Sequence, residues 1–185
     1  MSIPQIVSGF PVELRADAEA VAGILPEPQH VLGERAQRVT VQAQEIELPA
    51  RIYNPELSDQ TLRRLSPTQK LVAGCIYSRH NDGYVRQASC EALLPAQEPW
   101  LAPYVVQLLG EYVVEISTLI LDCLTAQSAF GWPSYRDFVR TNEPFIALTE
   151  QRAISYWSCY YRAAFSRAEY PALVALRNLR HAASS

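Results

Sequence analysis

The sequence contains few of the side chains from which catalytic and metal centres are usually built. Among its 185 residues are three histidines, four cysteines and a single lysine, Lys70. It has no GxGxxG or P-loop segment and no HExxH, GxSxG or EF-hand pattern, the usual signatures of nucleotide, zinc-protease, hydrolase and calcium sites. We therefore expect a protein that is not an enzyme and that has no catalytic residue, cofactor or metal ion.

The cysteines are too widely spaced for a zinc site of the common type. Successive cysteines are separated by 15, 33 and 36 residues, without a CxxC pair. Each lies in an apolar run with helical periodicity, where a cysteine is ordinarily a buried thiol. We expect all four to be buried, reduced and without metal: Cys75, Cys90, Cys123 and Cys159.

The sequence also lacks a strong excess of one charge and a stretch suited to cross a membrane. Its formal net charge is −3, so no general positive field attracts nucleic acid or an anionic membrane. The most hydrophobic stretch, residues 104–124, contains three acidic residues that would be costly inside a bilayer. The N-terminus has no basic start followed by a long apolar run, as a secretory signal would. We expect a cytoplasmic protein, and the excess of arginine over lysine favours a bacterial source.

Proline is concentrated in the first third of the chain, which is otherwise of ordinary globular composition. Six of the 13 prolines fall in residues 1–57. Within this segment residues 10–23 predict a short helix, because Pro11 lies at its first turn and Gly23 at its end. Residues 39–41 and 46–48 alternate apolar and polar side chains, which predicts a small β-hairpin. We expect residues 1–57 to cap the helices that follow.

From residue 58 onward the apolar residues recur with a helical period, which predicts an α-helical domain over residues 58–185. Ser66, Pro67 and Gln69 predict a helix start with a capping box, and Asp82 predicts the N-cap of the next helix. Both parts are expected to form one compact unit. Further helices are expected over residues 100–109, 111–124, 135–140, 142–165 and 171–181.

The sequence contains one internal repeat. Tyr84 and Val85 in its first copy correspond to Tyr112 and Val113 in its second. In its first copy Asp82 precedes Val85 and Arg86, and small residues precede Leu93. Residues 66–125 thereby resemble HEAT repeats, in which helical pairs stack and present a broad face to another macromolecule. The second copy has Gly110 and Val114 in place of the aspartate and arginine. The resemblance implies a mainly α fold with two stacked pairs, which would bury Val85, Leu93, Val113, Ile116 and Ile120.

The expected helix over residues 111–124 places three carboxylates together. At about 100° per residue, Glu111, Glu115 and Asp122 fall on a narrow strip opposite a broad apolar arc. Such a strip is ordinarily a solvated surface. Alternatively it belongs to a face that binds a basic partner, which would relieve the mutual repulsion of the carboxylates.

The most unusual local composition is Ser-Tyr-Trp-Ser-Cys-Tyr-Tyr-Arg at residues 155–162. Three interpretations stay open. Core packing is favoured by the helical spacing of Tyr156, Cys159, Tyr160 and Ala163. A protein-binding hot spot would use large aromatics beside an arginine, and aromatics near arginines can also stack on single-stranded bases. The hot-spot interpretation assigns partner binding to three further residues: Trp157, Tyr161 and Arg162.

A smaller polar cluster, His80 with Asp82 and Arg86, lies at a helix boundary. Turn chemistry explains it most simply; an acid–base role would need a nucleophile, and none is apparent.

These features predict a non-enzymatic bacterial protein-binding domain, of immunity, antitoxin or adaptor type. Its partner is expected to be a basic protein, bound through Glu111, Glu115 and Asp122 together with the aromatic hot spot. The alternative is a HEAT-like nucleic-acid-binding protein or an enzyme that uses the arginine–aromatic cluster at residues 152–167. Nothing in the sequence determines the oligomeric state.

Overall fold

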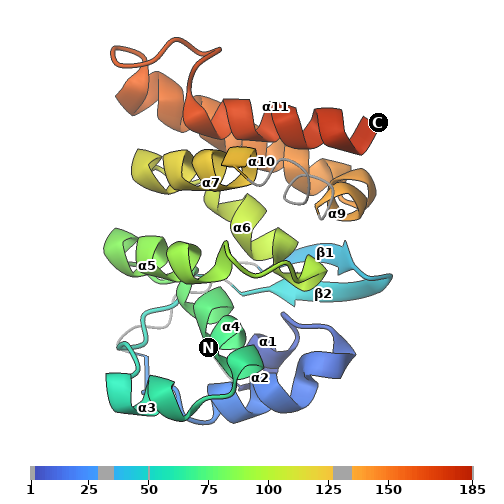
Figure 1. Ribbon diagram of the computed structural model, residues 1–185, viewed down its shortest axis with the longest axis vertical. Helices are drawn as coiled ribbons and strands as arrows, with labels where there is room; N and C mark the ends of the chain where they lie inside the picture. The colour runs from blue at the N-terminus through green and yellow to red at the C-terminus, as the bar shows by residue number, and fades with distance from the viewer. Residues whose placement is uncertain (1–2, 29–35, 50, 127–134, 185) are drawn as a thin grey trace. The chain divides into compact units, whose positions relative to one another are not determined.

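The computed structural model describes residues 3–28, 36–49, 51–126 and 135–184 (Figure 1). These residues are mainly helical and contain one two-stranded antiparallel sheet, which confirms the expected fold class at that level. Contacts divide the chain into two compact units, a first unit over Met1–Leu93 and a second over Leu94–Ser185. The first unit thus includes the hairpin and the helices up to Leu93, whereas the change in sequence pattern predicts a boundary after residue 57.

The first unit begins with three short helices, where the sequence predicted one. Helix α1 covers Ile3–Val7, the 3-10 helix η1 covers Val12–Leu14 and α2 covers Arg15–Ala22. Pro4 lies in the first turn of α1, where its missing N–H leaves no hydrogen bond unmade. Helix α2 ends at Gly23 as expected, and the α1 and α2 helices pack on each other.

The predicted hairpin is confirmed. Strand β1 (Gln37–Val41) pairs with β2 (Gln44–Leu48), and Val39 lies opposite Ile46. The turn consists of Gln42 and Ala43, both with positive φ, at 49° and 62°. Two successive positive φ values are what a two-residue turn needs to follow the twist of the strands, although asparagine and glycine are more usual there.

Helices α3 (Asp59–Arg64), α4 (Pro67–Tyr77) and α5 (Gly83–Leu93) complete the first unit. The capping box of α4 is confirmed, because the Gln69 N–H donates to Ser66 Oγ and the Ser66 N–H donates to Gln69 Oε1. Asp82 caps α5 by accepting the Tyr84 N–H at 2.8 Å. Helices α4 and α5 pack so closely that a Cβ on Gly74 would lie 3.0 Å from Leu93 Cδ2.

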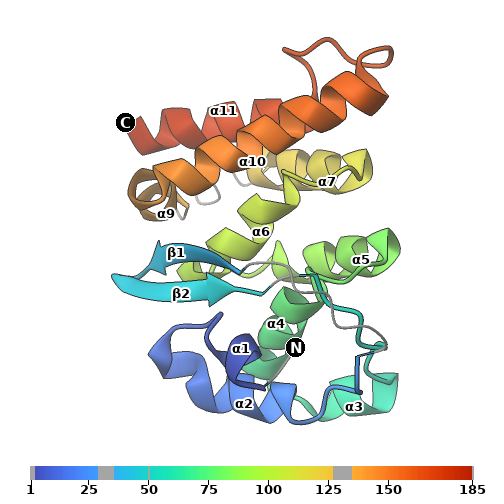
Figure 2. The ribbon, with the colours of Figure 1, turned by 180° about the vertical axis from the view of Figure 1, so that it is seen from behind.

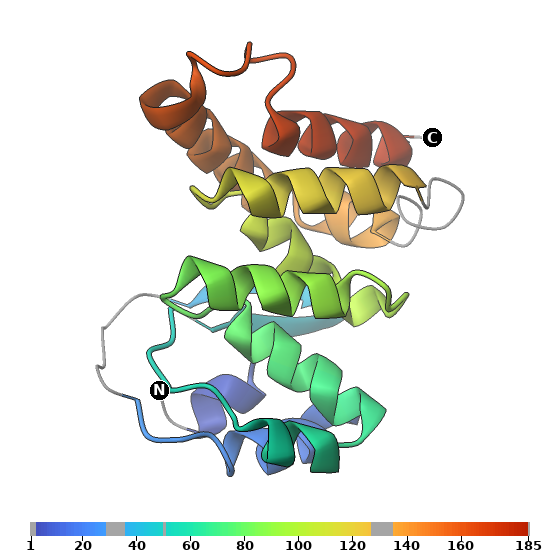
Figure 3. The ribbon, with the colours of Figure 1, turned by 60° about the vertical axis from the view of Figure 1, so that its left-hand side comes forward.

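The second unit is entirely helical over the part that the structure describes. Its last helix packs on three others, namely α7, α9 and α10 (Figures 2 and 3). The α6 side chains are all buried. The elements are η2 (Pro99–Leu101), α6 (Ala102–Leu108), α7 (Val114–Ala126), α9 (Arg136–Thr141), α10 (Glu143–Tyr156), the π-helical turn η3 (Trp157–Tyr161) and α11 (Pro171–Ser184).

Two of the expected helices are wrong in their limits. The helix expected from residue 111 begins at Val114, and the one expected to run to residue 165 ends at Tyr156 before the π-helical turn. Just before the start of α7 the chain passes close to α10, since a Cβ added to Gly110 would lie 3.2 Å from Thr149 Cγ2. The chain therefore turns tightly against α10 before α7 begins.

The two copies of the sequence repeat fall in different units, with α5 in the first and α7 in the second. HEAT-like stacking of one copy on the other therefore stays a prediction. Four of the five side chains expected to be buried in the repeat are buried, and Val113 is half-buried: Val85, Leu93, Ile116 and Ile120 are the four. None of the helices formed by the described residues is long and apolar enough to cross a membrane.

Candidate functional site

The three carboxylates do not form one exposed helical strip. Glu111 precedes α7 and is only 5% exposed, because the turn after Gly110 folds it against the unit. Glu115 in the first turn of α7 and Asp122 further along it are exposed. Of the acidic residues proposed for partner binding, two therefore remain on the surface.

The aromatic segment is not the core face that its spacing favoured. Cys159, Tyr160 and Ala163 are exposed, Tyr160 by 69%, and Tyr156 is half-buried. The core interpretation is wrong because α10 widens into a π-helical turn at Trp157, and the i→i+5 bonding of that turn changes which side chains face inward. Turns of this kind inside α-helices are frequent at functional sites.

The segment is held at two points by its own side chains. Trp157 Nε1 donates to the Phe165 carbonyl at 2.9 Å, and the Tyr161 hydroxyl donates to the Tyr112 carbonyl at 2.6 Å. The first bond closes the loop that follows η3, and the second ties η3 to the turn before α7. The exposed side chains between these ties are consequently carried on a fixed backbone.

Five tyrosines form a connected series of ring contacts, which we call the tyrosine array. The ring centroids of Tyr156 and Tyr160 are 6.3 Å apart and those of Tyr161 and Tyr170 are 5.5 Å apart, both pairs stacked. Tyr112 lies 6.1 Å from Tyr156 by the same measure, and Tyr160 lies 6.4 Å from Tyr161. The array runs from Tyr112 through the exposed Tyr160, its middle member, to Tyr170, which is fully buried. Aromatic pairs in such arrangements each add about 0.5–1.5 kcal/mol beyond the area they bury.

Three arginines lie near Tyr160 in the sequence. Arg162 directly follows Tyr161, and Arg152 and Arg167 lie on either side in the sequence. All three are exposed, and none of their guanidinium groups forms a hydrogen bond or ion pair with another residue that the structure describes. Their guanidinium groups therefore remain available to a ligand or partner.

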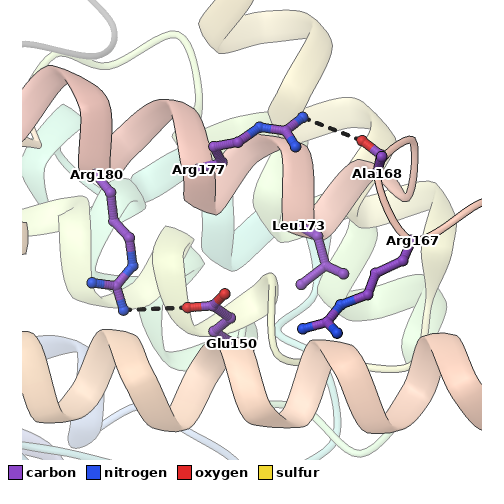
Figure 4. A pocket seen from close by; sticks show the side chains of 6 residues that line it. All are labelled: Glu150, Arg167, Ala168, Leu173, Arg177 and Arg180. Carbon is purple, nitrogen blue, oxygen red and sulfur yellow. Dashed lines mark hydrogen bonds and ion pairs between the residues drawn. The ribbon is translucent and has the colours of Figure 1, made fainter.

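A second concentration of arginine lines a pocket between α10 and α11 (Figure 4). Its volume is about 430 Å³. Glu150 comes from α10 and the rest of the lining from α11 and the segment before it: Arg167, Ala168, Leu173, Arg177 and Arg180.

The polar cluster of the first unit serves the backbone, as turn chemistry predicted. His80 Nδ1 accepts the Asp82 N–H at 3.0 Å, so Nε2 carries the proton and donates to the Asn54 carbonyl at 3.0 Å. The fully buried Arg86 donates from Nη1 to the carbonyls of His80 and Asn81. Both nitrogens of the histidine ring are thus occupied, which disfavours the acid–base alternative.

The cysteines differ from one another more than the sequence suggested. Cys75 and Cys90 are buried and Cys123 is half-buried, whereas Cys159 is exposed, so the expectation of four buried thiols is wrong for Cys159. Burial raises the pKa of Cys75 well above its ordinary value and also raises that of Cys123. Within the described ranges no three histidine, cysteine or acidic side chains are grouped as metal ligands.

Comparison of the chain with protein-family models, with curated proteins and with solved structures finds no match.

Two features of the site were not predicted from the sequence. Tyr160 was assigned to the core because a continuous α-helix was assumed, and only the π-helical turn moves it to the surface. The arginine pocket joins residues of α10 to residues more than 15 positions later. The arginines at positions 177 and 180, spaced three apart on a predicted helix, are the only local signal for it.

Proposed function

We propose that this chain is a protein-binding domain and that it contacts its partner through η3 and the residues just after it. The observation that carries the proposal is the 69% exposure of Tyr160 on a backbone fixed by hydrogen bonds on either side. Tyrosine, tryptophan and arginine are the residues most enriched in binding hot spots. A large aromatic side chain presented rigidly also loses little conformational entropy on binding.

The residues of this surface divide into two roles. Tyr160 and Arg162 are exposed and would contact the partner directly. Trp157 and Tyr161 are half-buried, and their polar atoms already bond to backbone carbonyls of the same unit. These two residues would therefore position the contact residues, although the sequence suggested them as contacts.

The charge of the partner follows from the side chains around the surface. Arg162, which directly follows Tyr161 and is exposed, favours acidic groups opposite the aromatic segment. Glu115 and Asp122 on α7 could still meet basic groups, but Glu111 is buried and is removed from the proposed interface. An immunity, antitoxin or adaptor role is a finer form of the same proposal and is supported only by the absence of enzyme signatures.

Single-stranded nucleic acid is the second candidate, because exposed aromatics beside unpaired arginines also suit base stacking. The net charge of −3 opposes it. The experiment below distinguishes the two.

The test is photo-cross-linking in cells that naturally contain the protein. A photoreactive phenylalanine derivative replaces Tyr160 in one variant and Tyr84 in the control, since Tyr84 is 86% exposed but lies in the first unit. We expect a discrete protease-sensitive adduct from position 160 that is missing from position 84. A nuclease-sensitive adduct from position 160 would favour the nucleic-acid candidate. Identical adduct patterns from both positions, or none, would contradict the proposed surface.

A further inference from the structure

The first unit has an open groove of its own, bordered by α1, η1, α2 and β2, with a volume of about 610 Å³. In Figure 2 the strand β2 crosses above α1 and α2. One wall of the groove is charged on the β2 side, where Glu45 and Glu47 line it, and Arg15 and Glu19 line it from α2. The apolar part of the lining comes from α1, η1 and the segment between them. We call this feature the α2–β2 groove.

The apolar part of the groove is open to solvent. Ile3 is 47% exposed and Val12 is 56% exposed, and both line the groove. Among the described residues only two other large aliphatic side chains are exposed, Ile24 and Leu148, and neither lines it. Single exposed aliphatic residues are ordinary on protein surfaces, whereas exposed apolar residues that gather in one place mark contact sites.

The two sides of the groove are held together by hydrogen bonds. Gln44, at the start of β2, accepts the Val12 N–H at 2.8 Å and donates to the two carboxylate oxygens of Glu13 at 2.9 and 3.0 Å. Further along β2, the Glu47 N–H donates to the Ser8 carbonyl at 2.8 Å. The strand is thereby tied both to η1 and to the residue after α1. A groove that is already formed loses little conformational entropy when a ligand enters it.

The groove lies in the most acidic part of the chain. Residues 1–49 contain seven acidic and three basic residues, whereas the other 136 contain 12 acidic and 13 basic. Arg38 lies 2.9 Å from Glu47 and 3.8 Å from Glu45, so one guanidinium serves two carboxylates. Four carboxylates therefore stand against two guanidinium groups in and beside the groove: Glu13, Glu19, Glu45 and Glu47 against Arg15 and Arg38.

We propose that the α2–β2 groove binds a basic, amphipathic segment of a protein partner. An apolar side chain of the segment would pack on Ile3 and Val12, and lysine or arginine side chains beside it would meet the excess carboxylates. The carboxylates come from two different elements and border an apolar surface. Such an arrangement suits charges that are spaced along a peptide, whereas a single small cation would need carboxylates that converge on one point. The same negative charge repels nucleic acid and anionic membranes.

This groove is a second surface, separate from the one under the proposed function. The segment at Tyr160 belongs to the second unit, and the α2–β2 groove lies entirely within the first. The two surfaces also differ in charge, because Arg162 accompanies Tyr160 and carboxylates predominate here. They would therefore select different partner segments.

The test begins with a random peptide library displayed on phage and selected on the immobilised whole chain. We expect peptides in which lysine or arginine flanks leucine, isoleucine or phenylalanine. The most enriched peptide is then synthesised with a fluorescent label, and its dissociation constant is measured by fluorescence anisotropy at low and high salt. Its affinity should fall as salt is added. Selection of acidic or uncharged peptides alone, or of none, would overturn the proposal.

Substitutions establish whether the selected peptide lies in the groove. Val12→Ser should weaken binding roughly fivefold, because it removes a partly exposed apolar contact. Glu19→Gln and Glu45→Gln should each weaken it by about twofold to fivefold at low salt and less at high salt. The matched controls are Ile24→Ser and Glu91→Gln, which replace exposed residues of the first unit outside the groove lining. Both should bind the peptide like the wild type.

Two results with these variants would contradict the groove. One is unchanged affinity in Val12→Ser and Glu45→Gln, which would place the peptide elsewhere. The other is an equal loss in Glu45→Gln and Glu91→Gln, which would indicate unspecific attraction to a negative protein. Amide spectra of each variant establish that it is folded. The proposed function is tested separately, because Tyr160→Ser should leave peptide binding unchanged and Val12→Ser should leave cross-linking from position 160 unchanged.

Discussion

Two regions of the sequence have a similar composition. One is the polar cluster around His80 in the first unit, and the other is the arginine–aromatic segment after α10 in the second. Each combines charged side chains with aromatic or histidine rings near a helix end. In the first unit these side chains bond to the backbone of their own turn, and Arg86 is fully buried. In the second, Arg162 and Arg167 are exposed, and their guanidinium groups bond to no residue that the structure describes. Side chains of similar type thus stabilise the fold in the first unit and remain available for binding in the second.

The largest expected difference between the two units is in the alkylation rates of their cysteines. Cys159 is exposed, whereas Cys75 is buried and burial raises its pKa. Alkylation by iodoacetamide needs an accessible thiolate, so Cys159 should react at least about 10³-fold faster than Cys75 in the native protein. Mass spectrometry of peptides from timed reactions measures both rates, and the two should converge in denaturant. Slow modification of Cys159 would restore the buried-face interpretation of residues 156–163.

Replacing one arginine in each region should change the free energy of unfolding by very different amounts. Arg86→Ala removes a buried guanidinium that serves two carbonyls, and we expect a loss of about 3–5 kcal/mol in the free energy of unfolding of the first unit. Arg162→Ala should change stability by less than about 0.5 kcal/mol, because the residue is exposed. Amide hydrogen exchange in α4, α5 and α11 measures each unit separately. Similar losses in the two variants would show that the two clusters are not used differently.

Alkaline pH tests the burial of one tyrosine in each unit. Burial raises the pKa values of Tyr77 and Tyr170 to about 12. Because an unfolded tyrosine titrates near about 10, the stabilisation is complete below that pH and is lost as the pH rises toward 12, by about 1 kcal/mol per tyrosine at pH about 11. Tyr77→Phe and Tyr170→Phe should each lose less stability than the wild type between pH 8 and 11.

The same two variants should differ at pH 8. The Tyr77 hydroxyl donates to the Pro55 carbonyl at 2.9 Å, so Tyr77→Phe should cost about 1 kcal/mol. The Tyr170 hydroxyl lies near Ser117 but makes no hydrogen bond of ordinary geometry, so Tyr170→Phe should cost about 0.5 kcal/mol or less. Urea unfolding followed by circular dichroism measures both. The reverse order would contradict the hydrogen-bond assignment.

The parts of the fold that follow local rules could be predicted from the sequence. The capping box at Ser66 and Gln69 and the alternation in the hairpin involve neighbours within a few residues, and both are confirmed. The start of α7 was predicted three residues too early; just before it, Gly110 lies against Thr149 of α10, a contact that the local sequence does not reveal. The π-helical turn at Trp157 likewise involves bonds to Phe165 and Tyr112. The exposure of Tyr160, and with it the candidate site, follows from those non-local contacts.

The most direct test of the account measures affinity for the protein captured at position 160. Its dissociation constant is compared for the wild type, Tyr160→Ala and Tyr84→Ala, two substitutions of exposed tyrosines in different units. Loss of a hot-spot tyrosine costs about 2 kcal/mol or more, so Tyr160→Ala should weaken binding roughly 30-fold and Tyr84→Ala by less than about twofold. Equal dissociation constants for all three proteins would contradict the claim that the segment after α10 is the binding surface.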